Sequence, residues 1–171
     1  MLWYIFLVPQ HIDGWRRKFM KQLNILYISL SGNTTDFVTR LSTYLTQFDV
    51  QVNATNVKAT PEPTVLDAPF VSILPAFLKG GNGVNNGYTE ILTGILGDYL
   101  AYADNYKHCF GIIGSGNRNF NKQFALTAKQ YAQRFGFPYL TEFELRGSEN
   151  DIQRIAALLL PHTYDLQGAQ A

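Results

Sequence analysis

The chain has 171 residues, of which 46% are hydrophobic and 16% charged, so it can bury one sizeable core and is not expected to be disordered. Its net charge of +1, with no basic cluster beyond residues 16–18, argues against nucleic-acid binding. A single cysteine excludes an internal disulfide, and the three histidines lack metal-ligand spacing, so we expect no metal site and a reducing, cytoplasmic setting.

The first segment of the chain, residues 1–19, differs from the rest. Residues 1–8 are apolar, but Pro9 ends this run and the basic residues follow it, which is the reverse of the order in a signal peptide. The run is also far shorter than the roughly 20 residues needed to cross a bilayer, so no membrane association is expected. We expect residues 1–19 to be an extension, or an upstream translated stretch, outside the folded domain.

The most informative segment is the turn after the first predicted strand. A nearly continuous apolar strand over residues 24–30 runs into this turn, and a helix with an apolar stripe is predicted over residues 36–45. One helix needs one capping residue, whereas the turn gathers Ser29, Ser31, Gly32, Asn33, Thr34 and Thr35. Free N–H groups and the helix dipole favour an anion site here, with helix capping alone as the alternative. Because the Walker A and dinucleotide glycine patterns are absent, a monophosphate is favoured.

The elements that follow alternate between strands and helices. Strands are predicted over residues 50–54, 70–74, 109–113 and 139–145. Helices are predicted over residues 88–103 and 121–135 and after Ser148, which resembles a capping box with Asp151. Two loops rich in glycine and asparagine follow the third and fourth strands, over residues 75–87 and 114–120.

This alternation predicts an α/β fold with a five-stranded parallel, doubly wound sheet and helices on both faces. In such sheets, ligands bind beyond the carboxyl ends of the strands. The turn that begins at residue 29 and the loops that begin at residues 75 and 114 all lie at that edge. We therefore expect the three segments to converge on one ligand site.

Two motifs carry a resemblance to a known family. Residues 27–34 resemble the phosphate loop of flavodoxins, which bind FMN. The run Ser115-Gly-Asn-Arg-Asn-Phe120, followed by a helix and then by Phe143-Glu-Leu-Arg-Gly-Ser148, is similar to the NrdI proteins, flavodoxin-like accessories of class Ib ribonucleotide reductase. The resemblance covers residues 20–160 and leaves residues 1–19 and the tail 161–171 outside it.

The resemblance implies a flavodoxin-like fold with strand order 2-1-3-4-5 and an FMN cofactor. The FMN phosphate would be held by Ser29, Ser31, Gly32, Asn33, Thr34 and Thr35. The isoalloxazine ring would be enclosed by Pro75, Ala76, Phe77, Gly80, Gly81, Asn82 and Gly83 on one side, and by Ser115, Gly116, Asn117, Arg118, Asn119 and Phe120 on the other.

The resemblance also implies a role. In this family, reduced FMN reacts with oxygen and delivers superoxide or peroxide to the small reductase subunit, where the oxidant helps to assemble a dimanganese tyrosyl-radical cofactor. The implied partners are that subunit and a flavin-reducing electron donor, and the protein is an activator more than a turnover enzyme. The alternatives are a general electron-transfer flavodoxin or flavin reductase, and a flavodoxin-like binding module that has lost its cofactor.

The charges in the predicted flavin loops are unusual for an electron carrier. These loops contain Lys79 and Arg118 but no carboxylate over residues 78–87 or 114–120, so their field should favour the reduced, anionic flavin. Arg118 would touch the flavin or a partner, or would simply be solvated. Cys109 lies inside a predicted strand and is expected to be buried packing without redox chemistry.

Overall fold

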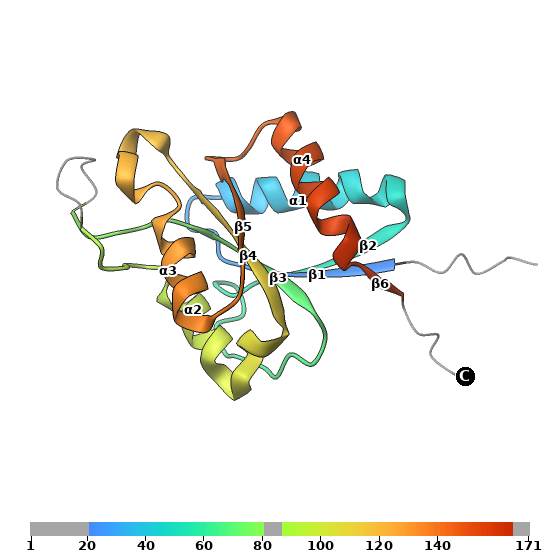
Figure 1. Ribbon diagram of the computed structural model, residues 1–171, viewed down its shortest axis with the longest axis horizontal. Coiled ribbons are helices and arrows are strands. Elements are labelled where there is room, and N and C mark those ends of the chain that lie inside the picture. The colour runs from blue at the N-terminus through green and yellow to red at the C-terminus, as the bar shows by residue number, and fades with distance from the viewer. Residues whose placement is uncertain (1–20, 81–86, 166–171) are drawn as a thin grey trace, which may run out of the picture.

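The computed structural model of the protein describes residues 21–80 and 87–165. Five parallel strands form one sheet: β1 (Lys21–Tyr27), β2 (Val50–Asn56), β3 (Phe70–Pro75), β4 (Cys109–Gly116) and β5 (Tyr139–Glu144). Their order is β2-β1-β3-β4-β5, which confirms the predicted topology (Figure 1). A short strand, β6 (Tyr164–Asp165), pairs antiparallel with the start of β1 and was not predicted. The proposed boundaries at residues 19 and 160 stay predictions.

Helices cover both faces of the sheet, as predicted. Figure 1 shows α1 (Asn33–Leu45) and α4 (Glu149–Leu159) together on one side, and α2 (Gly94–Ala101) and α3 (Leu126–Phe135) on the other. Short 3₁₀ turns lie at Thr46–Phe48, Tyr102–His108, Arg118–Gln123 and Leu160–His162. The helices therefore leave the carboxyl ends of the strands open to ligands.

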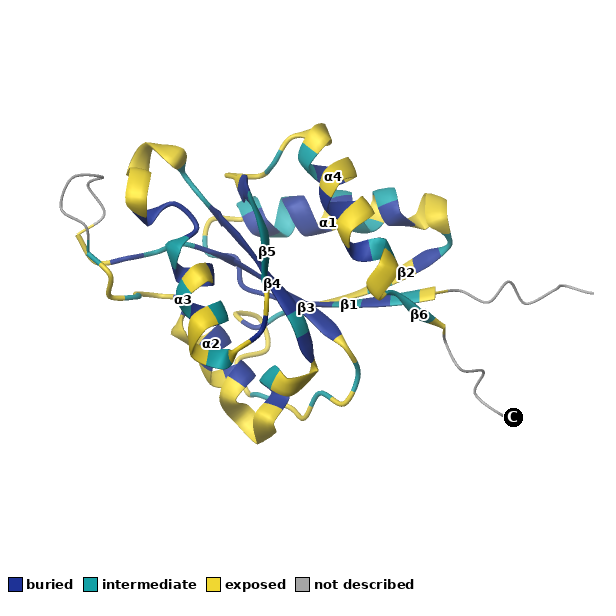
Figure 2. Ribbon diagram, viewed as in Figure 1, coloured by how far each residue is buried: buried dark blue, intermediate teal, exposed yellow. Residues whose placement is uncertain are grey.

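Each face of the sheet has its own apolar core, and the central strands β3 and β4 between them are almost entirely buried (Figure 2). On the α1 and α4 side, the rings of Phe37 and Phe143 stack with centroids 3.8 Å apart. On the α2 and α3 side, Cys109 packs with Leu100 and Tyr131, which confirms the expected burial of the cysteine. Burial raises the pKa of the Cys109 thiol to about 11, so it carries little thiolate near neutral pH.

The helix predicted over residues 88–103 is wrong in its first half. Only Gly94–Ala101 is α-helical, because residue Glu90 bridges to Leu78 in an antiparallel pair and Leu92 has a φ of 66°. The apolar residues that repeat at helical spacing in this segment fall into two groups accordingly. Leu96 and Leu100 are buried, whereas Ile91, Leu92 and Ile95 are exposed.

The element boundaries after β4 also differ from the prediction. β4 continues to Gly116, into the segment that was expected to be loop. The helix predicted from residue 121 begins at Leu126, because a 3₁₀ turn occupies Arg118–Gln123 and the φ values of Asn121, inside that turn, and of Ala125 are 46° and 55°. The capping box of α4 is confirmed, since the backbone N–H of Asp151 donates to Ser148 Oγ at 3.2 Å.

The edge strand β5 is covered along part of its open side by a side chain of α4. Arg154 Nη2 donates to the carbonyl oxygen of Glu142 at 2.8 Å, and Arg154 Nη1 donates to Thr141 Oγ1 at 2.5 Å. The same guanidinium group reaches Asp151 Oδ1 at 2.8 Å. Arg154 thus joins α4 to the main chain of the sheet edge.

Candidate functional site

The turn between β1 and α1 has the geometry of an anion site. Gly32 precedes the helix with a φ of 87°, a left-handed conformation that glycine adopts without strain, and this N-cap residue has no side chain with which to cap the helix. Ser29 Oγ accepts a hydrogen bond from the backbone N–H of Thr35 at 3.2 Å. Among the described residues, no acceptor is paired with the backbone N–H groups of Asn33 and Thr34. Unpaired N–H groups at the positive end of a helix are suited to a phosphate.

A carboxylate lies near this turn, but it is paired. Asp36, in the first turn of α1, accepts a hydrogen bond on Oδ2 from Arg40 Nε at 3.0 Å. Arg40 also donates to the carbonyl oxygens of Arg146 and Gly147 and to Glu149 Oε1. The positive charge of Arg40 thereby offsets the negative charge of Asp36, which would otherwise repel an anion at the turn.

The loops after β3 and β4 lie side by side, as expected from the topology. The backbone N–H of Ala76 donates to the carbonyl oxygen of Ser115 at 2.9 Å. Ser115 itself is 1% exposed, and its Oγ has no hydrogen-bond partner among the described residues. In the next turn, Asn117 Oδ1 accepts from the backbone N–H of Asn119 at 2.9 Å, which orders the start of the segment that leads to Phe120.

The turn between β1 and α1 and the loops after β3 and β4 line a single cleft of about 480 Å³, a size typical of small-molecule sites. The predicted site residues that line the cleft are Ser31, Asn33, Thr34, Pro75, Ala76, Phe77, Gly80, Ser115, Gly116, Asn117 and Phe120. Those described outside the lining are Ser29, Gly32, Thr35, Arg118 and Asn119. The predictions for Gly81, Asn82 and Gly83 fall outside the described residues.

Five lining residues were missed by the sequence analysis: Leu78, Ile91, Gln123, Phe124 and Leu145. Leu145 follows the carboxyl end of β5, so the rule that located the other loops could have found it. Ile91 was assigned to the helix predicted over residues 88–103, and Gln123 and Phe124 were assigned to the helix predicted over residues 121–135. Only the antiparallel pairing at residues 77–91 and the 3₁₀ turn before α3 bring these three side chains to the cleft.

The charge balance beside the cleft differs from the expectation. Glu144, at the end of β5, lies with Oε2 3.8 Å from Arg118 Nε, and its Oε1 accepts from the backbone N–H of residue 118 at 3.3 Å. The Arg118 guanidinium also lies 4.6 Å from the centre of the Phe124 ring. Sequence reasoning overlooked this carboxylate, which partly neutralises one of the two cations expected near a flavin.

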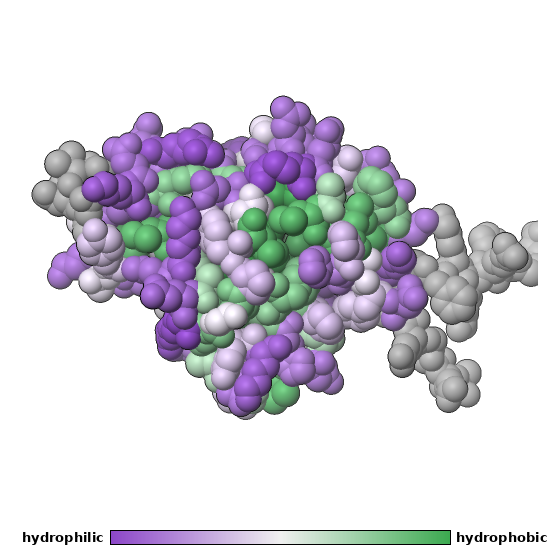
Figure 3. Space-filling model, viewed as in Figure 1, coloured by the Kyte–Doolittle hydropathy of each residue, from purple (hydrophilic) through white to green (hydrophobic). Residues whose placement is uncertain are grey.

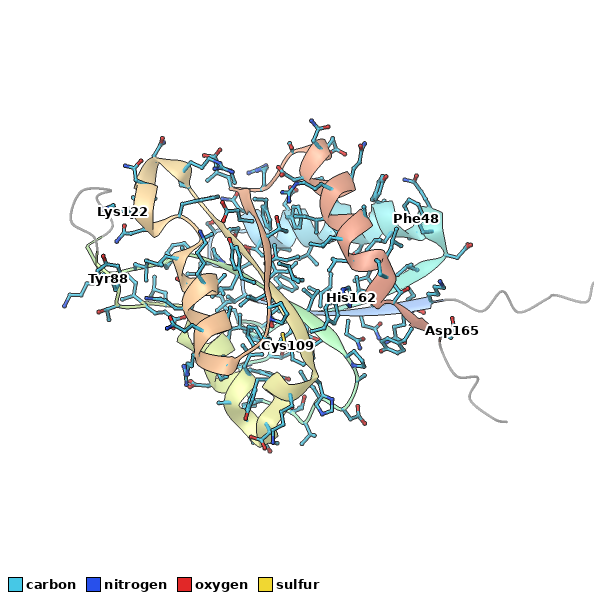
Figure 4. All side chains as sticks on the ribbon, viewed as in Figure 1. Phe48, Tyr88, Cys109, Lys122, His162 and Asp165 are labelled. Atoms are coloured by element: carbon cyan, nitrogen blue, oxygen red, sulfur yellow. The ribbon has the colours of Figure 1, made fainter. Side chains whose placement is uncertain are left out.

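The cleft lies toward one end of the molecule. In Figure 4, Tyr88 and Lys122 mark this end, and His162 and Asp165 lie toward the other. Figure 3 shows a mostly polar face with apolar areas between its charged side chains. Within the described residues, no helix is long and apolar enough to cross a bilayer. No group of histidine, cysteine, aspartate and glutamate in these residues could hold a metal ion.

Sequence comparisons identify relatives over most of the chain. A family model described as NrdI Flavodoxin like matches residues 25–157. A putative NrdI-like protein of Streptococcus pyogenes is 54% identical over 144 residues, covering 82% of this chain and 94% of the relative. A putative NrdI-like protein of Streptococcus pneumoniae is 51% identical over 146 residues, with the same coverage. A protein named Protein NrdI, from Streptococcus pyogenes, is 30% identical over 152 residues and 86% of each chain.

Solved structures share the fold. Oxidised flavodoxin 1 from Bacillus cereus superimposes with a TM-score of 0.52 at 15% identity, covering 80% of this chain and 93% of the other. A short-chain flavodoxin associated with a bacterial microcompartment superimposes with a TM-score of 0.51 at 17% identity, covering 81% and 93%. At such identities the likeness supports the flavodoxin-like fold alone.

Proposed function

Because this chain belongs to the NrdI flavodoxin-like family, we propose that it is an FMN-containing activator of a class Ib ribonucleotide reductase that acts in the cytoplasm. The family implies a flavin cofactor, and we propose more specifically that this flavin is FMN and that it binds in the cleft. The chemistry that the flavin would supply, once reduced by a separate electron donor, is the transfer of electrons to oxygen, and the small reductase subunit would use the resulting superoxide or peroxide to assemble its radical cofactor.

The observation that carries the proposal is the meeting of two unlike walls in one cleft. One part of the lining offers the backbone N–H groups of Asn33 and Thr34, which have no acceptor among the described residues. Another part consists of apolar side chains, among them Phe77, Ile91 and Phe124. FMN combines a phosphate with a flat aromatic ring, so it needs both walls at once. The residues present therefore fit the group.

The residues of the cleft divide the binding between them. Asn33, Thr34 and the exposed hydroxyl of Ser31 would bind the phosphate, while Gly32 gives the turn its shape. The buried hydroxyl of Ser115, which has no hydrogen-bond partner in the part of the chain that the structure describes, would bond to a polar atom of the flavin ring or its side chain. Apolar side chains on both loops would exclude water from the ring.

Exposed apolar side chains around the cleft support a protein partner. Phe120 and Leu145 line the cleft with exposures of 39% and 45%. Tyr88 and Leu92, which flank the lining residue Ile91, are exposed by 63% and 67%. Large apolar side chains gathered at one exposed site are typical of interfaces, and we assign this rim to the small reductase subunit.

Binding of FMN and of riboflavin, which lacks the phosphate, tests the cofactor. The purified protein should turn yellow with about one equivalent of FMN, and it should prefer FMN to riboflavin at least about tenfold, because charge-assisted hydrogen bonds hold the phosphate. Ser31→Asp places a negative charge in the turn and should remove this preference without weakening riboflavin binding. Thr43→Asp adds the same charge near the other end of α1 and should keep the preference.

If the purified protein is colourless and does not bind added FMN, the alternative of a cofactor-free binding module is supported and the other two functions are excluded. For the activator role, the reduced protein is mixed with a class Ib small subunit in the presence of oxygen, and the tyrosyl radical is measured by electron paramagnetic resonance. We expect a stable complex and more radical than free reduced FMN gives. A radical yield equal to that of free flavin would favour a general electron-transfer flavodoxin.

A further inference from the structure

Gln123 joins the wall of the cleft to a segment that sequence analysis did not connect with it. Its side chain is 3% exposed, lies at the end of the 3₁₀ turn before α3, and lines the cleft. Its Nε2 donates to the carbonyl oxygen of Gly87 at 2.9 Å. Because that oxygen can only accept, the amide orientation is fixed. Gln123 can then offer a bound molecule Oε1 as an acceptor, besides the second N–H of Nε2.

Gly87 leads into one arm of an antiparallel hairpin whose two arms also line the cleft. The backbone N–H of Lys79 donates to the carbonyl oxygen of Thr89, and the N–H of Ile91 donates to the carbonyl oxygen of Phe77, both at 2.9 Å. Phe77 and Ile91 line the cleft. A Cβ atom on Gly87 would lie 1.5 Å from the Lys79 carbonyl oxygen, so the two arms approach closely where Gln123 holds them.

A second group of side chains anchors the same hairpin outside the cleft. Gln130 Nε2, on α3, donates to the carbonyl oxygen of Tyr88 at 2.9 Å. The Tyr131 hydroxyl donates to Glu90 Oε1 at 2.7 Å, and burial together with this hydrogen bond raises the pKa of Tyr131. Neither Gln130 nor Tyr131 lines the cleft. Gln123 and Gln130 thus make the same kind of bond to neighbouring carbonyl groups, but only Gln123 can also contact a ligand.

We propose that Gln123 is a positioning residue that couples occupation of the cleft to the order of the hairpin formed by residues 77–79 and 87–91. A ligand that packs on Gln123 or bonds to its Oε1 restricts the side chain, and this strengthens its bond to the Gly87 carbonyl group. By thermodynamic reciprocity, an ordered hairpin must bind the ligand more tightly. The inference rests on the proposed function only in taking FMN as the ligand.

The test compares Gln123→Met with Gln130→Met, two substitutions that keep the side-chain length and remove one hydrogen bond each. Hydrogen exchange at the backbone amides of Lys79 and Ile91 reports on the hairpin, with and without FMN, and flavin fluorescence quenching gives the FMN dissociation constant. Both variants should exchange faster at these amides in the cofactor-free protein. At saturating FMN, exchange should slow by the same factor in the parent and in Gln130→Met, and by a clearly smaller factor in Gln123→Met, where only direct packing on Phe77 and Ile91 remains.

The FMN dissociation constant should rise about fivefold in Gln123→Met, the size expected for one hydrogen bond, and stay within about twofold in Gln130→Met. Equal effects of the two variants on FMN affinity would overturn the coupling and reduce Gln123 to a structural anchor. If the parent does not bind FMN, the proposed function fails, and the inference is then tested by hydrogen exchange in the cofactor-free protein. Unchanged exchange in Gln123→Met would then refute it, and faster exchange would support the anchoring on which it depends.

Discussion

Replacing Ser115 with alanine should stabilise the free protein and weaken its binding of FMN. Ser115 Oγ is buried at the end of β4 without a hydrogen-bond partner among the described residues. A buried hydroxyl without a hydrogen bond costs about 1–3 kcal/mol in proteins, and alanine removes this cost while losing one small atom. We expect the free energy of unfolding of the cofactor-free protein to rise by about 1 kcal/mol. For a chain of this length, that raises Tm by about 2–4 °C.

With FMN bound, the gain in the free energy of unfolding should disappear. If the Ser115 hydroxyl bonds to the flavin, its loss weakens binding by about 1 kcal/mol, or about fivefold in the dissociation constant. The stabilisation that saturating FMN gives to the folded state should fall by the same amount. Thermal unfolding with and without FMN, together with fluorescence titration, measures both quantities on the same sample.

Thr127→Val provides the matched control. Thr127 Oγ1 is the other buried side-chain atom without a partner in the described part of the chain, and it lies on α3 outside the cleft. Its replacement should stabilise the free protein in the same way and leave FMN affinity unchanged. The reasoning is refuted if Ser115→Ala destabilises the free protein by more than about 1 kcal/mol, or if both variants bind FMN like the parent.

Three further predictions follow from single residues. Gly32→Ala should lower the free energy of unfolding by about 1–2 kcal/mol in urea denaturation, because residue 32 has a φ of 87°, and an unchanged midpoint would contradict this conformational cost. Burial tends to raise the pKa of Asp151, but hydrogen bonds from Arg154 and Ser148 outweigh it and the pKa is lowered. The ionised Asp151 side chain therefore stabilises the fold above its unfolded pKa of about 4, and this stabilisation is lost as the pH falls through the lower pKa of the folded state. The parent should unfold at a higher urea concentration than Asp151→Asn near neutral pH, and this difference in urea midpoint should disappear in acid. Cys109, buried with a raised pKa, should resist iodoacetamide at pH 8 in the folded protein and react only after unfolding, as mass spectrometry would detect.

The fold could be predicted because its signals are local. Apolar runs marked the strands, Ser148 with Asp151 marked the start of α4, and the alternation of elements gave the parallel sheet. The helix at residue 88 was wrong because Ile91, Leu92, Ile95 and Leu96 repeat at helical spacing. The pairing of Glu90 with Leu78, distant in sequence, overrode that pattern.

The candidate site was predictable where it follows strand ends and not where packing builds it. The turn at residue 29 and the loops at residues 75 and 114 converge because parallel strands end at one edge. Gln123 carries no local sign that it would reach the cleft, since its position depends on the positive φ of Asn121 and on contact with Gly87. The pairing of Arg118 with a carboxylate was missed for a similar reason, because its partner Glu144 lies in β5, which is distant from Arg118 in the sequence.

The contact between Arg154 and β5 has a consequence for how this protein behaves at high concentration. An edge strand with free carbonyl and N–H groups can pair with the edge of another molecule and start aggregation. The Arg154 guanidinium occupies the Glu142 carbonyl oxygen and places a positive charge against the edge, so an incoming strand would have to displace it. Arg154 thereby acts as a gatekeeper against intermolecular strand pairing, and its loss should first be seen as poorer solubility during expression and concentration.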